Sequence, residues 1–371
     1  MAREILHKKP RAKIELWTDK KYFANAKKLV LEAEIPVRVK KIAAGKLRRY
    51  TDFTWRMYLE HFDIVMNNLV DMLRATRGHM QASLRLLKAR PDAIFLKGGY
   101  VCLPVGLAAK ALKIPYMIHD SDATPGLSNR LLAKGAKRIA TGMPLKYYQY
   151  DEEKAEWTGV PVAKEFREIS DKTHAKLKRE LGYDAEMPLV VVTGGSQGAQ
   201  DINQALGAIL PKLLRFTNVL LVAGRERYKE MLDLKQYEKW EEGELVSGFR
   251  MLEFSSEMWK LFGAADIVVS RAGASTMTEL AAMARTVIVI PNEELPGFHQ
   301  VKNAERYKEA DAALVVSNKK MREKPALLFE AIKNLLNNDA RRRALARNLK
   351  AFNRPRAARN IAEAVIKIAG R

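Results

Sequence analysis

The stretch Val191–Gln200, with the sequence VVTGGSQGAQ, contains residue types that could support either of two chemistries. Its glycines surround Ser196 in a G-x-S-x-G pattern, which presents the nucleophilic serine of an α/β-hydrolase. A hydrolase would also need a later acid, for which Asp266 and Glu279 are candidates, and a later histidine, which only His299 supplies. Alternatively, the stretch is a glycine-rich turn between a strand and a helix, whose backbone N–H groups bind a phosphate.

A second stretch, SRAGASTMTEL over Ser270–Leu280, also joins an expected strand to an expected helix through small residues. The helix would begin near Ala274 and Ser275, so its first N–H groups would point at a bound anion. Glu279 lies about one turn into this helix, where its carboxylate could accept hydrogen bonds from both hydroxyls of a ribose. A solvated acid on a helix face is the alternative for Glu279. The paired turns favour a nucleotide site over a hydrolase.

Length and composition indicate a two-domain protein without disulfides. The chain has 371 residues, of which 47% are hydrophobic, and Cys102 is its only cysteine. The sequence contains no apolar run of about 18 residues, the length that a membrane-spanning helix needs. Its first residues do not resemble a signal peptide. We therefore expect a protein of the cytosol or of a membrane surface.

The excess positive charge is concentrated in the first part of the chain. The formal net charge is +22, and residues 1–160 contribute +14 of it, from 30 Lys and Arg against 16 Asp and Glu. A basic surface suits nucleic acid, anionic lipid or a phosphorylated substrate, or it simply keeps the protein soluble. The sequence has no zinc-ligand spacing, no RNA-binding aromatic motif and no basic leucine zipper, so we expect no nucleic acid partner.

Short apolar strands alternate with helices along the chain, which predicts an α/β fold with doubly wound parallel sheets. In the first half we expect strands at RAKIELWT, IPVRVKKI, DAIFLKGG, IPYMIHD and AKRIATG, and a mostly helical stretch over 52–88. The alternation restarts at PLVVVTGG, after a hinge near Gly159–Lys164. We predict two α/β domains, over 1–160 and 161–345, and a C-terminal helix over 346–371 that returns towards the first domain.

Several motifs together resemble the MurG family of lipid-linked N-acetylglucosaminyltransferases. GGSQGAQDIN, SRAGASTMTELAAMA and HQVKNAERYKEADAA resemble its C-terminal domain, and RPDAIFLKGGY, PGLSNRLLAKGAKRIATG and TGVPV follow the order of its N-terminal domain. The match runs from about Lys46 to the end. The resemblance implies a GT-B fold, in which two Rossmann-like domains face a cleft. It also implies inverting transfer of GlcNAc from UDP-GlcNAc to the C4 hydroxyl of undecaprenyl-pyrophosphoryl-MurNAc-pentapeptide, which converts lipid I to lipid II in peptidoglycan synthesis.

The resemblance implies a donor site on the C-terminal domain and an acceptor site on the N-terminal domain. The diphosphate would be held around Ser196, the uracil around Phe254, and the ribose by Glu279. The donor-binding residues would be Gly195, Ser196, Gln197, Gly198, Phe254, Ser255, Arg271, Gly273, Ala274, Glu279, His299, Gln300 and Asn303. The acceptor-binding residues would be Gly98, Gly99, Tyr100, Asp122 and Lys164. His119 and Asp120 follow an expected buried strand and are the catalytic candidates, with Asp120 as the general base.

The chain departs from the family pattern in three places. The family begins with a strand and a GGTGGH loop, whose histidine is a favoured catalytic residue, whereas this sequence starts at MAREILHKKP. We expect either a true start further upstream or an N-terminal domain that lacks this strand and loop. The family's HEQN is HDSD here, from His119, and its GNPVR ends in Ala163, beside Lys164. A donor-binding but catalytically impaired protein is therefore an alternative to an active transferase.

The resemblance also implies the partners and the location. The partners would be UDP-GlcNAc, lipid I, the anionic inner-leaflet surface and other cell-wall synthesis proteins, with no metal or other cofactor. Within 52–88, the side chains of Trp55, Tyr58, Phe62 and Met66 could enter the membrane interface, or they could pack on the N-terminal sheet. We expect a peripheral protein at the cytoplasmic face of the cell membrane.

Overall fold

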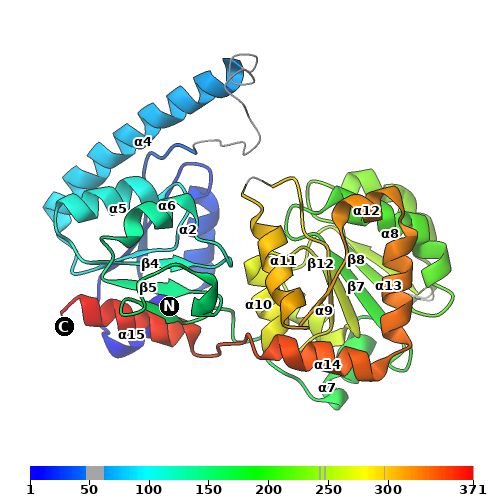
Figure 1. The fold of residues 1–371 in the computed structure, drawn as a ribbon. Helices are drawn as coiled ribbons and strands as arrows, with labels where there is room; N and C mark the ends of the chain where they lie inside the picture. The colour runs from blue at the N-terminus through cyan, green and yellow to red at the C-terminus, as the bar shows by residue number, and fades with distance from the viewer. Residues whose placement is uncertain (47–61, 242–243, 246–247, 296, 371) are drawn as a thin grey trace. The chain divides into compact units, whose positions relative to one another are not determined.

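The computed structural model describes residues 1–370 apart from 47–61, 242–243, 246–247 and 296. The chain forms two compact units (Figure 1): unit 1 contains Met1–Pro161 and Arg354–Arg371, and unit 2 contains Val162–Asn353. The sequence predicts the second boundary earlier, between residues 345 and 346. That boundary falls later because α14 (Asp339–Lys350) packs against α10 (Ala274–Met283) and α13 (Ala326–Leu336) inside unit 2.

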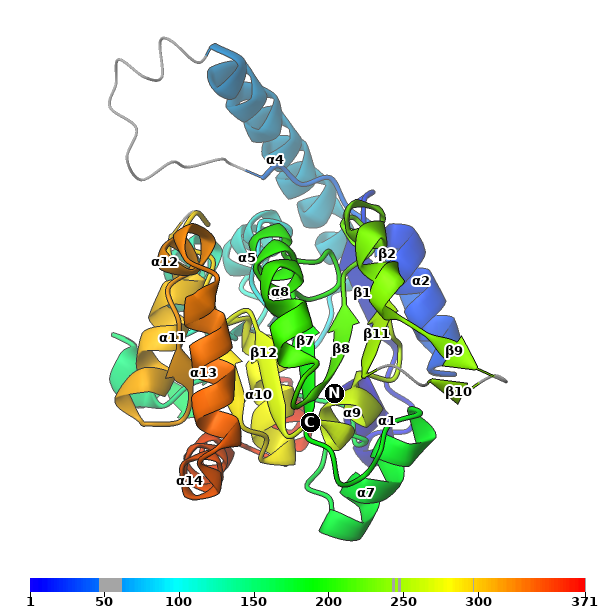
Figure 2. The same cartoon turned by 90° about the vertical axis from the view of Figure 1, so that its right-hand side faces the viewer.

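Unit 2 is built on one parallel sheet of six strands in the order β11-β8-β7-β12-β13-β14. Figure 2 shows the neighbouring strands β11, β8, β7 and β12 of this sheet. Its strands are β7 (Leu189–Thr193), β8 (Asn218–Val222), β11 (Phe249–Leu252), β12 (Ile267–Ser270), β13 (Val287–Val289) and β14 (Leu314–Val315). Every residue of the central strands β7, β8 and β12 is buried. Burial of both strand faces is typical of a parallel sheet covered by helices on two sides, as the apolar runs predict.

The helices of unit 2 bury apolar stripes against this sheet. In α8 (Gln200–Leu213), residues at three-to-four spacing such as Ile202, Leu206 and Ile209 are buried and share one core cluster with Val190 and Val192 of β7. The other helical segments are α7 (Asp171–Glu180), η2 (Tyr228–Tyr237), α9 (Met258–Ala264), α10 (Ala274–Met283), α11 (His299–Glu309), α12 (Asn318–Glu323) and α13 (Ala326–Leu336). A short antiparallel pair, β9 (Trp240–Glu241) and β10 (Glu244–Leu245), lies apart from the sheet.

Unit 1 carries its strands in two separate parallel sheets. One holds β3 (Ile94–Leu96), β4 (Tyr116–Asp120), β5 (Arg138–Thr141) and β6 (Ala155–Trp157), and the other holds β1 (Ile14–Thr18) and β2 (Val37–Lys41). β4 is buried along its whole length, whereas no residue of β1, β2 or the connecting α2 (Phe23–Glu32) is fully buried. The expected N-terminal sheet is thus in two parts, and β1 and β3 each form an edge.

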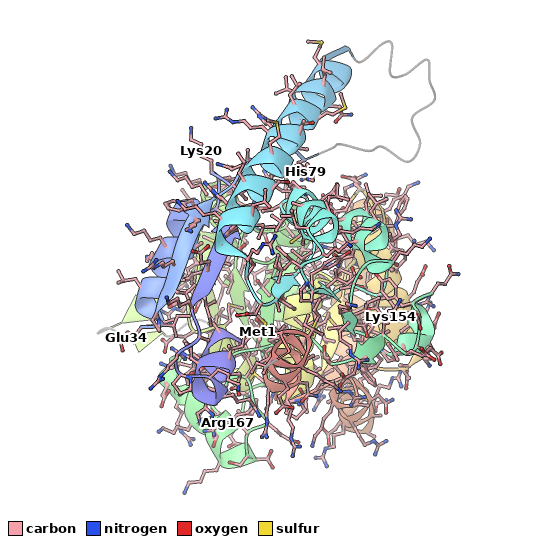
Figure 3. All side chains as sticks on the ribbon, turned by 90° about the vertical axis from the view of Figure 1, so that its left-hand side faces the viewer. Met1, Lys20, Glu34, His79, Lys154 and Arg167 are labelled. Atoms are coloured by element: carbon pink, nitrogen blue, oxygen red, sulfur yellow. The ribbon has the colours of Figure 1, made fainter. Side chains whose placement is uncertain are left out.

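The remaining segments of unit 1 are α1 (Ala2–Lys8), α4 (Phe62–Ala89), α5 (Cys102–Ala111), α6 (Leu127–Ala133), η1 (Leu145–Tyr147) and α15 (Ala357–Ile368). α15 packs against α1, β4 and β5, so the end of the chain joins the first unit. α4 packs against α5, where the carbonyl of Pro104 lies 3.3 Å from Nδ1 of His79 (Figure 3). The N-terminal part of α4 protrudes from this unit (Figure 1). Among the described helices, none is long and apolar enough to cross a membrane.

Candidate functional site

The first glycine-rich turn connects β7 to α8. Gly194 approaches the backbone so closely that a Cβ there would lie 2.2 Å from the nitrogen of Ala199, so no larger residue fits. Gly195 has a φ of +86°, and its N–H donates to Oγ1 of Thr193 at 3.2 Å. Within the described chain, the exposed N–H groups of Ser196 and Gln197 donate to no protein atom. These two groups precede α8, whose N-terminal capping residue is Ala199, and N–H groups that are free at such a place are able to bind an anion.

The remaining predicted member of this turn, Gly198, fixes its shape. The N–H of Gly198 donates to the carbonyl of Gly195 at 3.0 Å, which closes the turn and occupies that donor. A Cβ on Gly198 would lie 2.1 Å from the carbonyl oxygen of Ala223, at the end of β8. The described residues show no hydrogen bond from the Ser196 hydroxyl to a histidine or an acid. The arrangement therefore lacks the nucleophile activation that a serine hydrolase requires.

The second turn connects β12 to α10 and has open space in front of it. Gly273 is the N-terminal capping residue of α10, and a Cβ at this position would meet no atom within 4 Å. Glu279, on the same helix, is partly buried, and burial raises the pKa of its carboxyl group to about 7. No described side chain pairs with Glu279. Burying a carboxyl group without a partner is costly, so Glu279 is a good candidate to receive hydrogen bonds from a ligand.

Three further predicted donor residues are held by hydrogen bonds within unit 2. The amide nitrogen of Asn303 donates to the carbonyl of Ala272 at 2.9 Å, and the residue is fully buried, so it holds the turn from behind and does not face solvent. The guanidinium of Arg271 donates to Oδ1 of Asn318 at 2.7 Å. The side-chain oxygen of Gln300 accepts a hydrogen bond from the N–H of Asn292, which also lies in unit 2. His299 is the exposed first residue of α11.

Two further turns lie on the same edge of the sheet. Phe254, which follows β11, is 42% exposed, and the hydroxyl of the adjacent Ser255 accepts from the N–H of Glu257 at 3.1 Å. Arg225, which follows β8, places its guanidinium carbon 4.0 Å from the centroid of the Phe254 ring. Because β11, β8, β7 and β12 are neighbours and parallel, their carboxyl ends meet at one edge, the usual ligand-binding edge of an α/β sheet. Sequence reasoning missed Arg225, although the strand NVLLV followed by Ala-Gly-Arg resembles the other turns.

The predicted catalytic pair forms the last two residues of β4, inside the strand rather than after it. His119 is 1% exposed, its Nε2 donates to the carbonyl of Gly159 at 3.0 Å, and burial lowers its pKa to about 4. His119 is therefore neutral at pH 7. The carboxylate of Asp120 accepts from the hydroxyl of Tyr150 at 2.5 Å and from the N–H of Gly126 at 3.1 Å. Burial raises the pKa of Asp120 despite these hydrogen bonds.

The predicted acceptor residues lie in different parts of the molecule. Gly98 and Gly99 follow β3 with φ values of +93° and +84°, and a Cβ on Gly99 would meet no atom within 4 Å. The hydroxyl of Tyr100 donates to Asp19, which follows β1 and which sequence reasoning missed. Asp122 uses its carbonyl to accept from Tyr148 at 2.7 Å, and the exposed Lys164 lies in unit 2.

Burial and the partner carboxylate both raise the pKa of Tyr100, so its hydroxyl keeps its proton. The hydrogen bond therefore runs from Tyr100 to Asp19, and it joins the turn after β3 to the turn after β1. In the part of the chain that the structure describes, no group of three or more His, Cys, Asp and Glu could hold a metal ion.

Comparisons with known proteins match both units. The glycosyltransferase family 28 N-terminal domain matches residues 22–141, and the glycosyltransferase family 28 C-terminal domain matches residues 189–361. The UDP-N-acetylglucosamine--N-acetylmuramyl-(pentapeptide) pyrophosphoryl-undecaprenol N-acetylglucosamine transferase of Lachnoclostridium phytofermentans is 32% identical over 313 residues, which cover 81% of each chain. The protein of the same name from Acetivibrio thermocellus is 32% identical over 305 residues, covering 81% of this chain and 79% of that one.

Solved structures share the two-domain architecture. MurG of Acinetobacter baumannii superposes with a TM-score of 0.70 at 20% identity, covering 99% of this chain and 95% of that one. UDP-GlcNAc 2-epimerase of Neisseria meningitidis, bound to UDP-GlcNAc, gives a TM-score of 0.61 at 12% identity, covering 95% of this chain and 99% of that one. These matches confirm the predicted GT-B class of fold.

Proposed function

Because the chain belongs to the family of UDP-N-acetylglucosamine--N-acetylmuramyl-(pentapeptide) pyrophosphoryl-undecaprenol N-acetylglucosamine transferases, we propose that it catalyses the transfer this family is named for. It is a glycosyltransferase of peptidoglycan synthesis that moves GlcNAc from UDP-GlcNAc to lipid I. The structural observation that best supports this function is the edge of the unit 2 sheet, where two glycine-rich turns flank a partly buried carboxyl group without a partner.

The donor would bind along this edge of unit 2. The N–H groups of Ser196 and Gln197 and the first turn of α10 would hold the diphosphate, because both helices present the positive ends of their dipoles there. Glu279 would accept hydrogen bonds from the ribose, and the exposed ring of Phe254 would stack on the uracil. These N–H dipoles can stabilise the negative charge that develops on departing UDP, so we propose no metal cofactor.

The acceptor would bind at the carboxyl ends of the unit 1 strands. Gly98 and Gly99 would hold the lipid pyrophosphate, and the attacking C4 hydroxyl would lose its proton to a carboxylate. We keep Asp120 as the base, since its position at the end of β4 and its raised pKa suit proton uptake. The hydroxyl of Tyr150 must then give up its hydrogen bond or share it with the acceptor.

We also place the enzyme on the inner membrane surface through α4. Among its residues whose side chains the structure describes, this helix exposes eight apolar ones, namely Met66, Leu69, Val70, Met72, Leu73, Met80, Leu84 and Leu87. The same helix also contains Arg74, Arg77 and Lys88. Exposed Met66 does not pack on the sheet, whereas Trp55 and Tyr58 lie outside the described residues, as does the side chain of Phe62. An amphipathic, basic helix of this kind binds anionic lipid surfaces.

A transfer assay tests the proposed function directly. Purified protein is incubated with UDP-GlcNAc and a lipid I analogue, and lipid II and UDP are quantified. We expect equal amounts of both products, with no release of free GlcNAc. UDP-GlcNAc binding without product would instead support the catalytically impaired alternative, and absence of donor binding would refute the proposal.

A further inference from the structure

Arg225 lies between two of the turns assigned to the donor. β8 lies between β11 and β7 in the sheet, so the residues after β8 emerge between Phe254 and the first glycine-rich turn. The backbone N–H of Arg225 donates to the carbonyl of Ser196 at 3.4 Å, and its guanidinium stacks on Phe254. One residue thus contacts both the expected diphosphate turn and the expected base-binding ring.

The backbone holds Arg225 at this place. The preceding Gly224 has a φ of +89°, and a Cβ there would lie 2.1 Å from the nitrogen of Gly198. The two loops therefore touch backbone to backbone, which only glycine permits. Because of this contact, the origin of the Arg225 side chain is fixed relative to the N–H groups of Ser196 and Gln197.

The charge of Arg225 has no acidic partner among the residues that the structure describes. Other arginines of unit 2 do have such a partner: Arg227 pairs with Glu230 at 2.7 Å, and Arg306 pairs with Glu309 at 2.7 Å. Arg225 instead presents a guanidinium without an acidic partner, placed over an exposed aromatic ring. A guanidinium in this state suits a phosphate, to which it can donate two parallel hydrogen bonds.

We propose that Arg225 is a further ligand-binding residue of the donor site, whose guanidinium pairs with the diphosphate of the nucleotide sugar. This inference rests on the proposed function and names a contact that the glycine-rich turns do not provide. The N–H dipoles of the turn and the guanidinium approach the diphosphate from two neighbouring loops. Phe254 keeps the guanidinium oriented, so less conformational freedom is lost when the phosphate binds.

The alternative role for Arg225 is a surface cation–π pair that only steadies its loop. The two roles differ in which ligands they affect. A diphosphate contact affects UDP and UDP-GlcNAc but not uridine, which has no phosphate. A role in loop stability or base stacking affects all three ligands equally.

Ligand binding to four proteins tests the inference: the wild type, Arg225→Gln, Arg225→Lys and the control Arg215→Gln. Arg215 is also exposed, but it precedes β8 and thus lies at the opposite end of that strand. Dissociation constants for UDP-GlcNAc and UDP are measured by calorimetry, and the constant for uridine is measured by NMR titration. Thermal unfolding confirms that all four proteins fold.

We expect Arg225→Gln to raise the Kd for UDP and UDP-GlcNAc by about tenfold to a hundredfold, the range of a charge-assisted hydrogen bond. The Kd for uridine should stay within about twofold, Arg215→Gln should match the wild type, and Arg225→Lys should fall between. Unchanged UDP binding by Arg225→Gln, or equal weakening of UDP and uridine, overturns the inference alone. A wild type that binds neither UDP nor UDP-GlcNAc overturns the proposed function as well.

Discussion

The candidate binding turns of unit 2 all follow strands of one continuous sheet, whereas those of unit 1 follow strands of two separate sheets. In unit 2, the turns after β11, β8, β7 and β12 follow four adjacent strands of one buried sheet. In unit 1, the turns after β1 and β3 belong to two sheets. The helix over the smaller sheet is thinly packed, since Leu29 and Leu31 of α2 are 65% and 77% exposed.

This difference determines what holds each site in shape. A continuous hydrogen-bonded ladder fixes neighbouring strand ends, so the donor turns need few side-chain contacts with one another. The turns of unit 1 are instead linked by the Tyr100–Asp19 hydrogen bond, which joins residues 81 positions apart. We therefore expect the donor site to be preformed and the acceptor site to adjust more readily on binding.

The largest effect is expected for a variant of unit 1 that lowers the rate of transfer without changing donor binding by unit 2. Asp120→Asn keeps the shape of the side chain but removes a base, which should lower kcat by about 10²–10⁴-fold. The Kd for UDP-GlcNAc should not change, because every proposed donor residue lies in unit 2. Steady-state lipid II formation and calorimetry measure the two quantities. A normal kcat for Asp120→Asn would show that another residue is the base.

Glu279→Ala should change the Kd for UDP-GlcNAc, which Asp120→Asn leaves unchanged. Loss of hydrogen bonds to the ribose should weaken UDP-GlcNAc binding by roughly tenfold or more, since hydrogen bonds to a charged group contribute about 1.5–3 kcal/mol each. Exposed Glu330 on α13 provides the matched control, and Glu330→Ala should bind donor normally. An unchanged Kd for a folded Glu279→Ala protein would refute the ribose assignment.

The same carboxyl group should make the stability of the protein depend on pH. Burial raises the pKa of Glu279 to about 7 in the folded state, so between pH 4.5 and 7 the folded state binds the proton that the unfolded state has lost. Stability from this group is therefore present at low pH and is lost as pH rises through 7. Glu279→Gln should gain about 1–3 kcal/mol relative to the wild type between pH 5 and pH 8.

Chemical unfolding at pH 5 and pH 8 measures this difference, with Glu330→Gln as the control. If Glu279→Gln and the wild type respond to pH in parallel, Glu279 is not a buried, unpaired carboxyl group. Such a result would remove the partly buried carboxyl group without a partner from the description of the donor edge of unit 2.

Membrane binding should depend on unit 1 alone. Leu73→Ser combined with Leu84→Ser removes two exposed leucines of α4 and should weaken vesicle binding by about tenfold. Leu232→Ser, at an exposed leucine of unit 2, is the control. Binding should require anionic lipid and should fade with salt, since the screening length shrinks to about 3 Å at 1 M. Equal flotation with neutral and anionic vesicles would contradict the electrostatic part.

The sequence was most informative where structure is local. The run PLVVVTGG predicts a buried strand ending in a glycine-rich turn, and β7 and Gly194–Gly198 confirm it, because apolar runs and glycines act within a few residues. Strand IPYMIHD is likewise confirmed as β4. The alternation of strands and helices was sufficient for the α/β class, since a parallel sheet requires crossover connections.

Properties that depend on distant partners could not be predicted. The spacing of α11 does not reveal that Asn303 faces inward to Ala272, because this depends on how the helix packs. The contact of Arg225 with Phe254 and that of Tyr100 with Asp19 each join separate strand ends. The division of unit 1 into two sheets is also non-local, since it depends on which strand edges pair.

The smallest effect is expected for a variant that tests whether the Tyr100–Asp19 hydrogen bond holds the two sheets of unit 1 together. Tyr100→Phe removes the donor but keeps the ring, and should destabilise β1, β2 and α2 by about 1 kcal/mol. Amide exchange in Ile14–Thr18 and Val37–Lys41 should become several-fold faster, while exchange in β7 and β8 stays unchanged. Tyr22→Phe, which removes an exposed hydroxyl nearby, should alter neither region. If Tyr100→Phe leaves amide exchange in β1 and β2 unaffected, the smaller sheet is held by packing against the rest of unit 1. The turns of unit 1 would then differ less from those on the continuous sheet of unit 2 than we infer.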